Sequence, residues 1–242
     1  MKKCLMLLTL LALAAPVAAQ HVEIAGRAGV GLFRFGGQNA TSNSFVLYQD
    51  LGASSEGYVN NPYGSRVGTG LALGGRVQRV GSHNGLLAFD LGYELLRSRN
   101  NINQLFYSPS QFSSFIGVYS ADGSAALQSK NLTAFLGLGR RLKASLVEVD
   151  ILAGPELAYI YELRDKGSGT YNGGQPWAIN SLRSYESRLD LRLRADITVW
   201  YHQLGANASY SHGLLNYQSG LKGTNSEVYA RILRLGLAYR LK

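Results

Sequence analysis

The sequence is poor in cysteine, methionine and proline, and each shortage narrows what the chain can be. Its one cysteine, Cys4, stands near the N-terminus, so the rest of the chain has neither disulfides nor thiol chemistry. Two methionines and five prolines, against fifteen tyrosines and twenty-nine glycines, point away from helices and towards strands and turns. Beyond the N-terminal segment no run of eighteen apolar residues occurs, which predicts that the chain has no transmembrane helix.

The N-terminal segment has the pattern of an export signal. Two lysines precede an apolar run over residues 5–14, and Pro16 with small residues follows. The run is too short to cross a bilayer as a helix. Because Cys4 lies inside this segment and not at its end, we expect no lipid-modified cysteine. The sequence therefore predicts a cleaved signal peptide over residues 1–19 and a mature, exported domain over residues 20–242.

Residues that carry enzymatic chemistry are scarce. Ser211 stands beside His212, but neighbouring strand residues point to opposite faces and do not readily form a nucleophile–base pair. Gly-x-Gly pairs lie inside strand-like segments and open no helix, so they form no phosphate-binding loop. We therefore expect a protein that is not an enzyme, with no catalytic, cofactor-binding or metal-binding residues and no cofactor. The histidines lack metal-ligand spacing; they are His21, His83, His202 and His212.

A period of two runs through much of the chain and is clearest in "RLDLRLRADITVWY", residues 188–201. Leu189, Leu191 and Leu193 fall on one face of a strand, and the charged residues between them fall on the other. In a soluble sandwich the leucines would point inward. In a membrane barrel they would point outward to lipid, and the charges would fill the lumen.

Eight segments share this period, and the connections between them alternate in length. Long connections gathered at one end match a transmembrane barrel that has short periplasmic turns and long outer loops. The long connections, rich in Asn, Ser, Gly and Tyr, cover residues 36–66, 98–127 and roughly 164–184, and the short turns cover 80–84, 143–145 and 202–203. The eight segments are residues 22–34, 67–79, 85–97, 128–142, 146–163, 185–201, 204–217 and 227–241.

The acidic residues test which face is the inner one, because the outward face can be assigned from the apolar residues alone. Ten of the fifteen acids share the parity opposite to the leucines, and eight arginines share it too. Closely packed charges in a narrow interior must pair, since burying an unpaired charge is costly. A soluble eight-stranded barrel with leucines inside is the alternative. The expected inner residues are Glu23, Asp90, Glu94, Glu148, Asp150, Glu156, Glu162, Glu186, Asp190 and Asp196, with Arg27, Arg76, Arg141, Arg188, Arg192, Arg194, Arg234 and Arg240.

Aromatic residues and glycines agree with the membrane alternative. Tyr229 and Tyr239 face outward and are ten residues apart. At ~3.3 Å per residue and a ~40° tilt they span about 25 Å, the height of an apolar band between aromatic girdles. Glycines on the charged parity, such as Gly74, Gly92 and Gly236, are expected to make room for arginine side chains inside a small barrel.

Two stretches resemble known families. "RLGLAYRL", residues 234–241, resembles the signal that the outer-membrane assembly machinery recognises on a last strand, although Lys242 follows where an aromatic residue is usual. "SYSHGLLNY", residues 209–217, is similar to the penultimate strand of the PorT-like, or porin-family, outer-membrane β-barrels. The resemblance implies an architecture like that of small OmpA/OmpX-type barrels, and the porin label does not imply conduction.

Together these patterns predict an all-β protein, an eight-stranded antiparallel up-and-down transmembrane β-barrel of a bacterial outer membrane. We expect its lumen to be packed, charge-paired and closed, because side chains fill the interior of an eight-stranded barrel. The expected partners are outer-membrane lipids and, during biogenesis, the barrel assembly machinery. Nucleic acid is not expected despite a net charge of +9, because many arginines sit opposite acids and form no clustered basic face.

Function is then expected in the outer loops, as a structural or surface-interaction role. One alternative is a narrow porin-like channel for small solutes, which glycines on the lumen face would allow. A less favoured alternative is a lipid-modifying enzyme built on Ser211 and His212. Aromatic residues of the loops either form an adhesive surface or pack the loops onto the barrel rim; they are Phe45, Tyr48, Tyr58, Tyr63, Phe106, Tyr107, Phe112 and Tyr119.

Overall fold

The computed structural model of the chain describes residues 19–50, 55–109, 117–184, 188–219 and 226–241. The expected signal peptide up to residue 18, Phe112 and Glu186 lie outside these ranges. All regular structure in the described residues is strand, and no described segment is a helix that could cross a membrane. The eleven strands are β1 (Ala19–Gly36), β2 (Asn43–Asp50), β3 (Ser55–Val59), β4 (Arg66–Gly81), β5 (Gly85–Ser108), β6 (Gly117–Ala144), β7 (Val147–Tyr171), β8 (Gln175–Leu182), β9 (Leu189–Tyr201), β10 (Leu204–Gly213) and β11 (Tyr229–Arg240).

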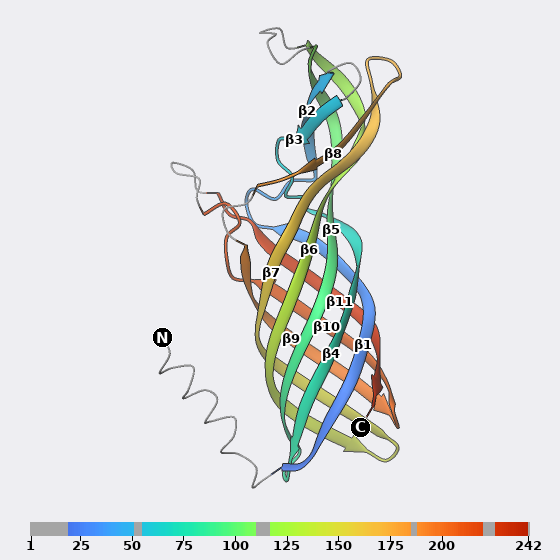
Figure 1. Cartoon of the computed structure of the whole chain (residues 1–242), viewed down its shortest axis with the longest axis vertical. Helices are drawn as coiled ribbons and strands as arrows, with labels where there is room; N and C mark the ends of the chain where they lie inside the picture. The colour runs from blue at the N-terminus through green and yellow to red at the C-terminus, as the bar shows by residue number, and fades with distance from the viewer. Residues whose placement is uncertain (1–18, 51–54, 110–116, 185–187, 220–225, 242) are drawn as a thin grey trace.

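Antiparallel pairings follow one another around a closed path, which we call the closed sheet. Along this path β1 pairs with β4, β4 with β5, β5 with β6, and β6 with β7. The path continues from β7 to β9, β10 and β11, and β11 pairs with β1. Figure 1 shows these strands coiling around a common axis, with the C-terminus at one end and β2, β3 and β8 at the other.

The sequence predicted three long outer loops. This prediction is wrong, because most residues of these segments form strands. The first contains β2 and β3, the second continues β5 and β6, and the third continues β7 and contains β8. The structure therefore has eleven strands where the sequence predicted eight, and the pairing of β2 with β5 is parallel. We call β2, β3, β8 and the parts of β5, β6 and β7 beyond residues 97, 128 and 163 the outer extension. Within it, β2 pairs with β5 and the extended part of β6 pairs with that of β7 across long sequence separations, which local composition does not reveal.

The short turns lie where the sequence predicted them. Asn84, Ser145 and His202, one in each turn, have positive φ angles of 61°, 51° and 53°. Positive φ at such positions matches the twist of two strands joined by a tight turn. These turns lie at the end of the closed sheet opposite the outer extension (Figure 1).

The faces of the closed sheet follow the predicted parity. In β9 exposed and buried residues alternate without a break from Leu189 to Tyr201. The large apolar side chains lie outside, with Leu138 66% and Leu237 71% exposed, whereas Asp150 and Glu156 inside are 0% exposed. Strand 204–217, which the sequence left unassigned, follows the same rule, because Ser209 and Ser211 are buried.

Two charged residues depart from the predicted parity. Lys130 pairs with Glu162 while the next residue of β6, Asn131, pairs with Ile160, so β7 bulges by one residue at Tyr161. A bulge reverses the alternation beyond it. The prediction that Glu162 faces inward is therefore wrong, and its carboxylate pairs with Lys130 at 3.0 Å on the outer side. Arg188 was also predicted inside but is exposed just before β9 begins.

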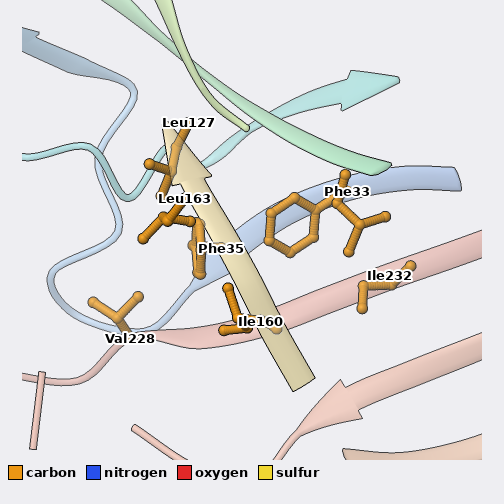
Figure 2. Packing of buried hydrophobic residues seen from close by; sticks show 9 residues of the cluster. Phe33, Phe35, Leu127, Ile160, Leu163, Val228 and Ile232 are labelled. Carbon is orange, nitrogen blue, oxygen red and sulfur yellow. The ribbon is translucent and has the colours of Figure 1, made fainter. Parts of the chain in front are cut away.

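An apolar cluster closes the end of the interior next to the outer extension. On the inner face of β1 the charged residues give way to Phe33 and Phe35, each 2% exposed. Figure 2 shows these rings packed among aliphatic side chains from other strands. The rings of Tyr63 and Tyr217 each lie 5.1 Å from that of Phe35. We call this cluster the outer plug; it comprises Phe33, Phe35, Leu96, Leu127, Ile160, Leu163, Val228, Ala230 and Ile232.

The outer extension has an apolar core of its own. Trp177 and Ile179 of β8 face Val46 and Val59 of β2 and β3, with Leu105 of β5 in the same buried cluster. This burial, and not loop composition, explains why the segments that the sequence predicted as loops hold regular strands.

The sequence predicted that glycines on the inner parity make room for arginine side chains. In the structure they do not do so directly. A Cβ on Gly70 would lie 1.9 Å from the carbonyl oxygen of Leu95, and one on Gly139 would lie 1.8 Å from that of Ile151. These glycines allow neighbouring backbones to approach closely. Gly137 instead leaves space for the ring of Phe135.

Candidate functional site

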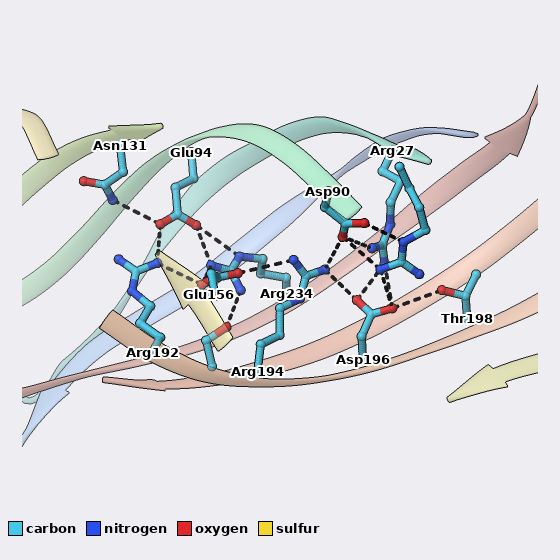
Figure 3. A network of polar contacts seen from close by, with 12 residues as sticks. Arg27, Asp90, Glu94, Asn131, Glu156, Arg192, Arg194, Asp196, Thr198 and Arg234 are labelled. Carbon is cyan, nitrogen blue, oxygen red and sulfur yellow. Dashed lines mark hydrogen bonds and ion pairs between the residues drawn. The ribbon is translucent and has the colours of Figure 1, made fainter. Parts of the chain in front are cut away.

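Paired charges occupy the interior of the closed sheet, and the first cluster lies midway along it. Arg76 donates two hydrogen bonds to Asp90, at 2.7 and 2.8 Å. Arg27 bridges Asp90 at 3.0 Å and Asp196 at 2.9 Å, and Arg76 also reaches Asp196 at 3.1 Å. Four strands, β1, β4, β5 and β9, thus meet through two guanidinium groups and two carboxylates (Figure 3).

A second cluster lies closer to the outer plug. Glu94 accepts from Arg192 at 2.6 Å and from Arg234 at 2.7 Å, and Glu156 accepts from the same two arginines at 3.2 and 2.9 Å. Arg194 joins this cluster to the first, because it contacts Glu156 at 3.2 Å and Asp196 at 2.5 Å. Figure 3 shows both clusters as one continuous network.

A third cluster lies near the short turns. Arg141 pairs with Glu23 at 2.7 Å and with Asp150 at 2.6 Å. The indole of Trp200 donates to Asp150 at 2.9 Å, and the guanidinium of Arg240 lies 4.4 Å from the Trp200 ring centre. This end of the interior is therefore also filled with side chains.

Most residues of the three clusters were predicted from the sequence, but most of their contacts across the interior were not. The sequence missed Trp200 and Gln78, whose inward parity was readable but whose role as donors to Asp150 depends on register across strands. Glu148 is only half-buried and lies 3.2 Å from Arg240.

The interior holds a small cavity. A cavity of about 60 Å³ lies between the first two clusters, lined by residues that include Arg27, Asp90, Arg194 and Arg234. Such a volume holds a few water molecules and no larger solute. Within the described residues, the buried Nε of Arg194 has no hydrogen-bond partner in the protein.

The candidate nucleophile and base do not meet. Ser211 is buried inside the closed sheet and its hydroxyl accepts from Arg234 at 2.7 Å. His212 lies on the outer side, with Nδ1 3.4 Å from the Tyr210 hydroxyl. In the described part of the chain, no group of three His, Cys, Asp or Glu side chains could hold a metal ion.

The aromatic residues of the outer extension serve mainly as packing. Tyr48 is buried, and Tyr107 and Tyr119 pack against the same core. The rings of Phe45 and Phe106 lie 4.6 Å apart. Tyr58 differs, because the residue is 51% exposed.

A buried ion pair joins the two edges of the outer extension. Asp165 of β7 accepts from Nε of Arg183 at 2.7 Å and from the backbone amide of Val59 in β3 at 3.2 Å. Arg183 also donates to the Val59 carbonyl, and Ser181 donates to Gly57 at 2.6 Å. Burial raises the pKa of Asp165 despite the opposing effect of Arg183. The sequence placed Asp165 in a loop and gave no signal for this contact.

Comparisons with known proteins identify no family. No family model matches the chain, and no curated protein matches it. Among solved structures, it is similar to Neisserial surface protein A at 12% identity, over 91% of this chain and 99% of that one, with a TM-score of 0.37. It is also similar to the translocator domain of the autotransporter NalP from Neisseria meningitidis at 10% identity, over 99% and 95% of the two chains, with a TM-score of 0.27. Likeness at this level assigns no function.

Removing one member of a buried ion pair should lower the free energy of unfolding more than removing both members does. We expect Arg76→Met to lower the free energy of unfolding by about 1.5–3 kcal/mol, because Asp90 keeps its charge and loses its bidentate partner while Arg27 remains 3.0 Å away. The double variant Arg76→Met/Asp90→Leu should cost less than Arg76→Met alone. Denaturant unfolding in detergent measures both, and equal or larger loss in the double variant would refute the role of pairing.

The stability of the outer extension should depend on pH through Asp165. Because its pKa is raised in the folded chain, folding favours the protonated carboxyl, and stability falls as the pH rises from the ordinary value of 3.8 through the raised one. Hydrogen exchange in β8 should therefore show the wild type losing protection relative to Asp165→Asn over this range. Asp122→Asn, at an exposed carboxylate, is the matched control and should follow the wild type.

Proposed function

We propose that the chain is an integral protein of a bacterial outer membrane and that the closed sheet is its eight-stranded, up-and-down transmembrane barrel. The observation that carries the proposal is the inversion of polarity: the leucines lie outside and the paired charges inside. A water-soluble monomer rarely exposes apolar patches larger than a few hundred Å². Here exposed aliphatic side chains follow one another on neighbouring strands around the closed sheet.

Aromatic rings at the two edges of this apolar face support a bilayer position. On β11, Leu233, Leu235 and Leu237 lie between Tyr229, which is half-buried, and Tyr239, which is exposed. Elsewhere Tyr93 and Tyr161 lie side by side towards the outer extension, with ring centres 6.3 Å apart. Tyrosine rings at the two interfaces are typical of membrane barrels. Short turns are typical of the periplasmic end, so the outer extension would face the outside of the cell.

The proposed role is structural or surface-interacting, through the outer extension. Its packed core and the ion pair of Asp165 with Arg183 make it a preformed surface on which Tyr58 is exposed. The β11 stretch "RLGLAYRL", which pairs with β1, remains the proposed recognition segment for the barrel assembly machinery. Membership of the PorT-like family and cleavage of residues 1–19 stay predictions of the sequence.

The proposed position in the bilayer can be tested by tryptophan fluorescence in lipid. We expect Leu235→Trp to be quenched by lipids brominated on their acyl chains, because Leu235 is 50% exposed and lies near the midpoint between Tyr229 and Tyr239 on the apolar face. Tyr58→Trp, exposed on the outer extension, is the matched control and should not be quenched. The folded protein should also migrate differently on a denaturing gel before and after boiling. A soluble protein with no mobility shift and no quenching would contradict the proposal.

A narrow channel is the second candidate, suggested by the 60 Å³ cavity. The outer plug on one side and the Arg141–Asp150–Trp200 contacts on the other argue against continuous passage. We therefore expect no single-channel conductance in planar bilayers. Steady conductance of the wild type would favour the channel.

We further propose that the protein is not an enzyme, so Ser211→Ala should leave lipids in the membrane unchanged relative to wild type.

A further inference from the structure

A groove of about 530 Å³ lies on the outward face of the sheet, where the outer extension meets the proposed barrel. Three cationic side chains line it: Arg97 and Arg99 of β5 and Lys166 of β7. Ser124, Gln128 and Ser168 contribute further hydroxyl and amide groups, and the lining continues with Thr69 and Asn180.

The register explains why the groove is open between its cations. Arg99 pairs with Ala126, and Ala126 pairs with Lys166, so one small side chain separates the two long ones. Since neighbouring strands lie ~4.8 Å apart, Arg99 and Lys166 start about 10 Å apart, a gap that two extended side chains can close around one anion. Arg97 pairs with Gln128 in the next outward-facing row.

The positive charge of the groove is not neutralised within the described chain. No described carboxylate lies within ion-pair distance of Arg97, Arg99 or Lys166. The neighbouring acid, Glu162, is already bound to Lys130 at 3.0 Å and to Arg164 at 3.4 Å. The interior shows the opposite arrangement, because there the arginines meet carboxylates. An external anion is therefore the natural partner of the groove.

The position of the groove indicates the kind of anion. Arg97 follows Leu95 and Tyr93 on the same face of β5, and Leu71 and Leu91 below them are exposed. At ~3.3 Å per residue and a ~40° tilt, Arg97 lies about 10 Å beyond Tyr93 along the membrane normal, in the region of lipid headgroups. Arginines bind phosphate oxygens bidentately, and clusters of basic residues at an interface attract anionic lipids.

We propose that this groove binds the phosphate-bearing headgroup of a lipid whose acyl chains lie along the leucines of β4 and β5. The inference rests on the proposed bilayer position of the closed sheet. It adds a specific site, on one side of the barrel, to the general expectation that lipids surround the protein.

Native mass spectrometry of the full chain, folded in detergent, tests the site with dilauroyl phosphatidic acid as the probe. We expect it to bind more tightly than dilauroyl phosphatidylcholine, which has the same chains. Arg97→Gln/Arg99→Gln/Lys166→Gln should weaken its binding by about 10–100-fold. The matched control, Arg79→Gln/Arg140→Gln/Lys143→Gln, removes the same charge near the opposite end of the apolar face and should weaken binding much less than the groove variant does, because these residues do not line the groove.

Each outcome decides one point. Equal binding of the two lipids by the wild type, or unchanged binding by the groove variant, would overturn the proposal. Displacement of the lipid by inorganic phosphate at similar concentrations would overturn the proposal that the bound phosphate belongs to a lipid. The groove would then be a simple anion site. The boiling-dependent gel shift of each variant reports whether it is folded. If the triple variant does not fold, the single variant Arg99→Gln replaces it. Absence of the gel shift in the wild type would count against the proposed barrel and not against the groove.

Discussion

The pairing of guanidinium and carboxylate groups inside the closed sheet is the constraint on which the rest of the structure depends. A buried charge without a partner is strongly destabilising, so Arg76, Asp90 and Asp196 are tolerable only as a set. An interior of this kind supplies little hydrophobic free energy. The apolar side chains lie on the outer face instead. Contact of that face with water is unfavourable, so it requires an apolar environment. The polarity of the chain and its proposed place in a membrane are two aspects of one arrangement.

Along the axis the interior changes character, and this change locates function. Charges fill the middle, the outer plug closes one end, and the outer extension continues beyond it around the Trp177 and Ile179 core. A small cavity lies between the charged clusters. Two exposed regions remain for chemistry with an outside partner: the surface of the outer extension and the groove of Arg97, Arg99 and Lys166.

Much of the fold could be predicted from the sequence, because alternation is a local property. The inward parity of Glu94, Asp150 and Asp196 was readable without any knowledge of pairing, and so were the tight turns at Asn84 and Ser145. Glu162 was misplaced because the bulge at Tyr161 is set by the register between β6 and β7, which the sequence of β7 does not encode visibly. The first predicted loop holds strands because β2 pairs with β5, far along the chain, which local composition does not reveal. The third holds a strand because β8 forms a tight hairpin with β7, which its loop-like composition concealed.

The sequence by itself determined the class of the protein and which residues face inward. Period two, charges on one parity and leucines on the other are enough for that, since a strand has only two faces. The tertiary structure alone decided which charges meet, where the interior is sealed and where positive charge stays unneutralised. Arg27 meets Asp196 across 169 positions of the chain, and the ion pair of Asp165 with Arg183 holds β3 through the Val59 backbone. Such contacts depend on strand register and sheet closure, and each is set by the packing of the whole chain.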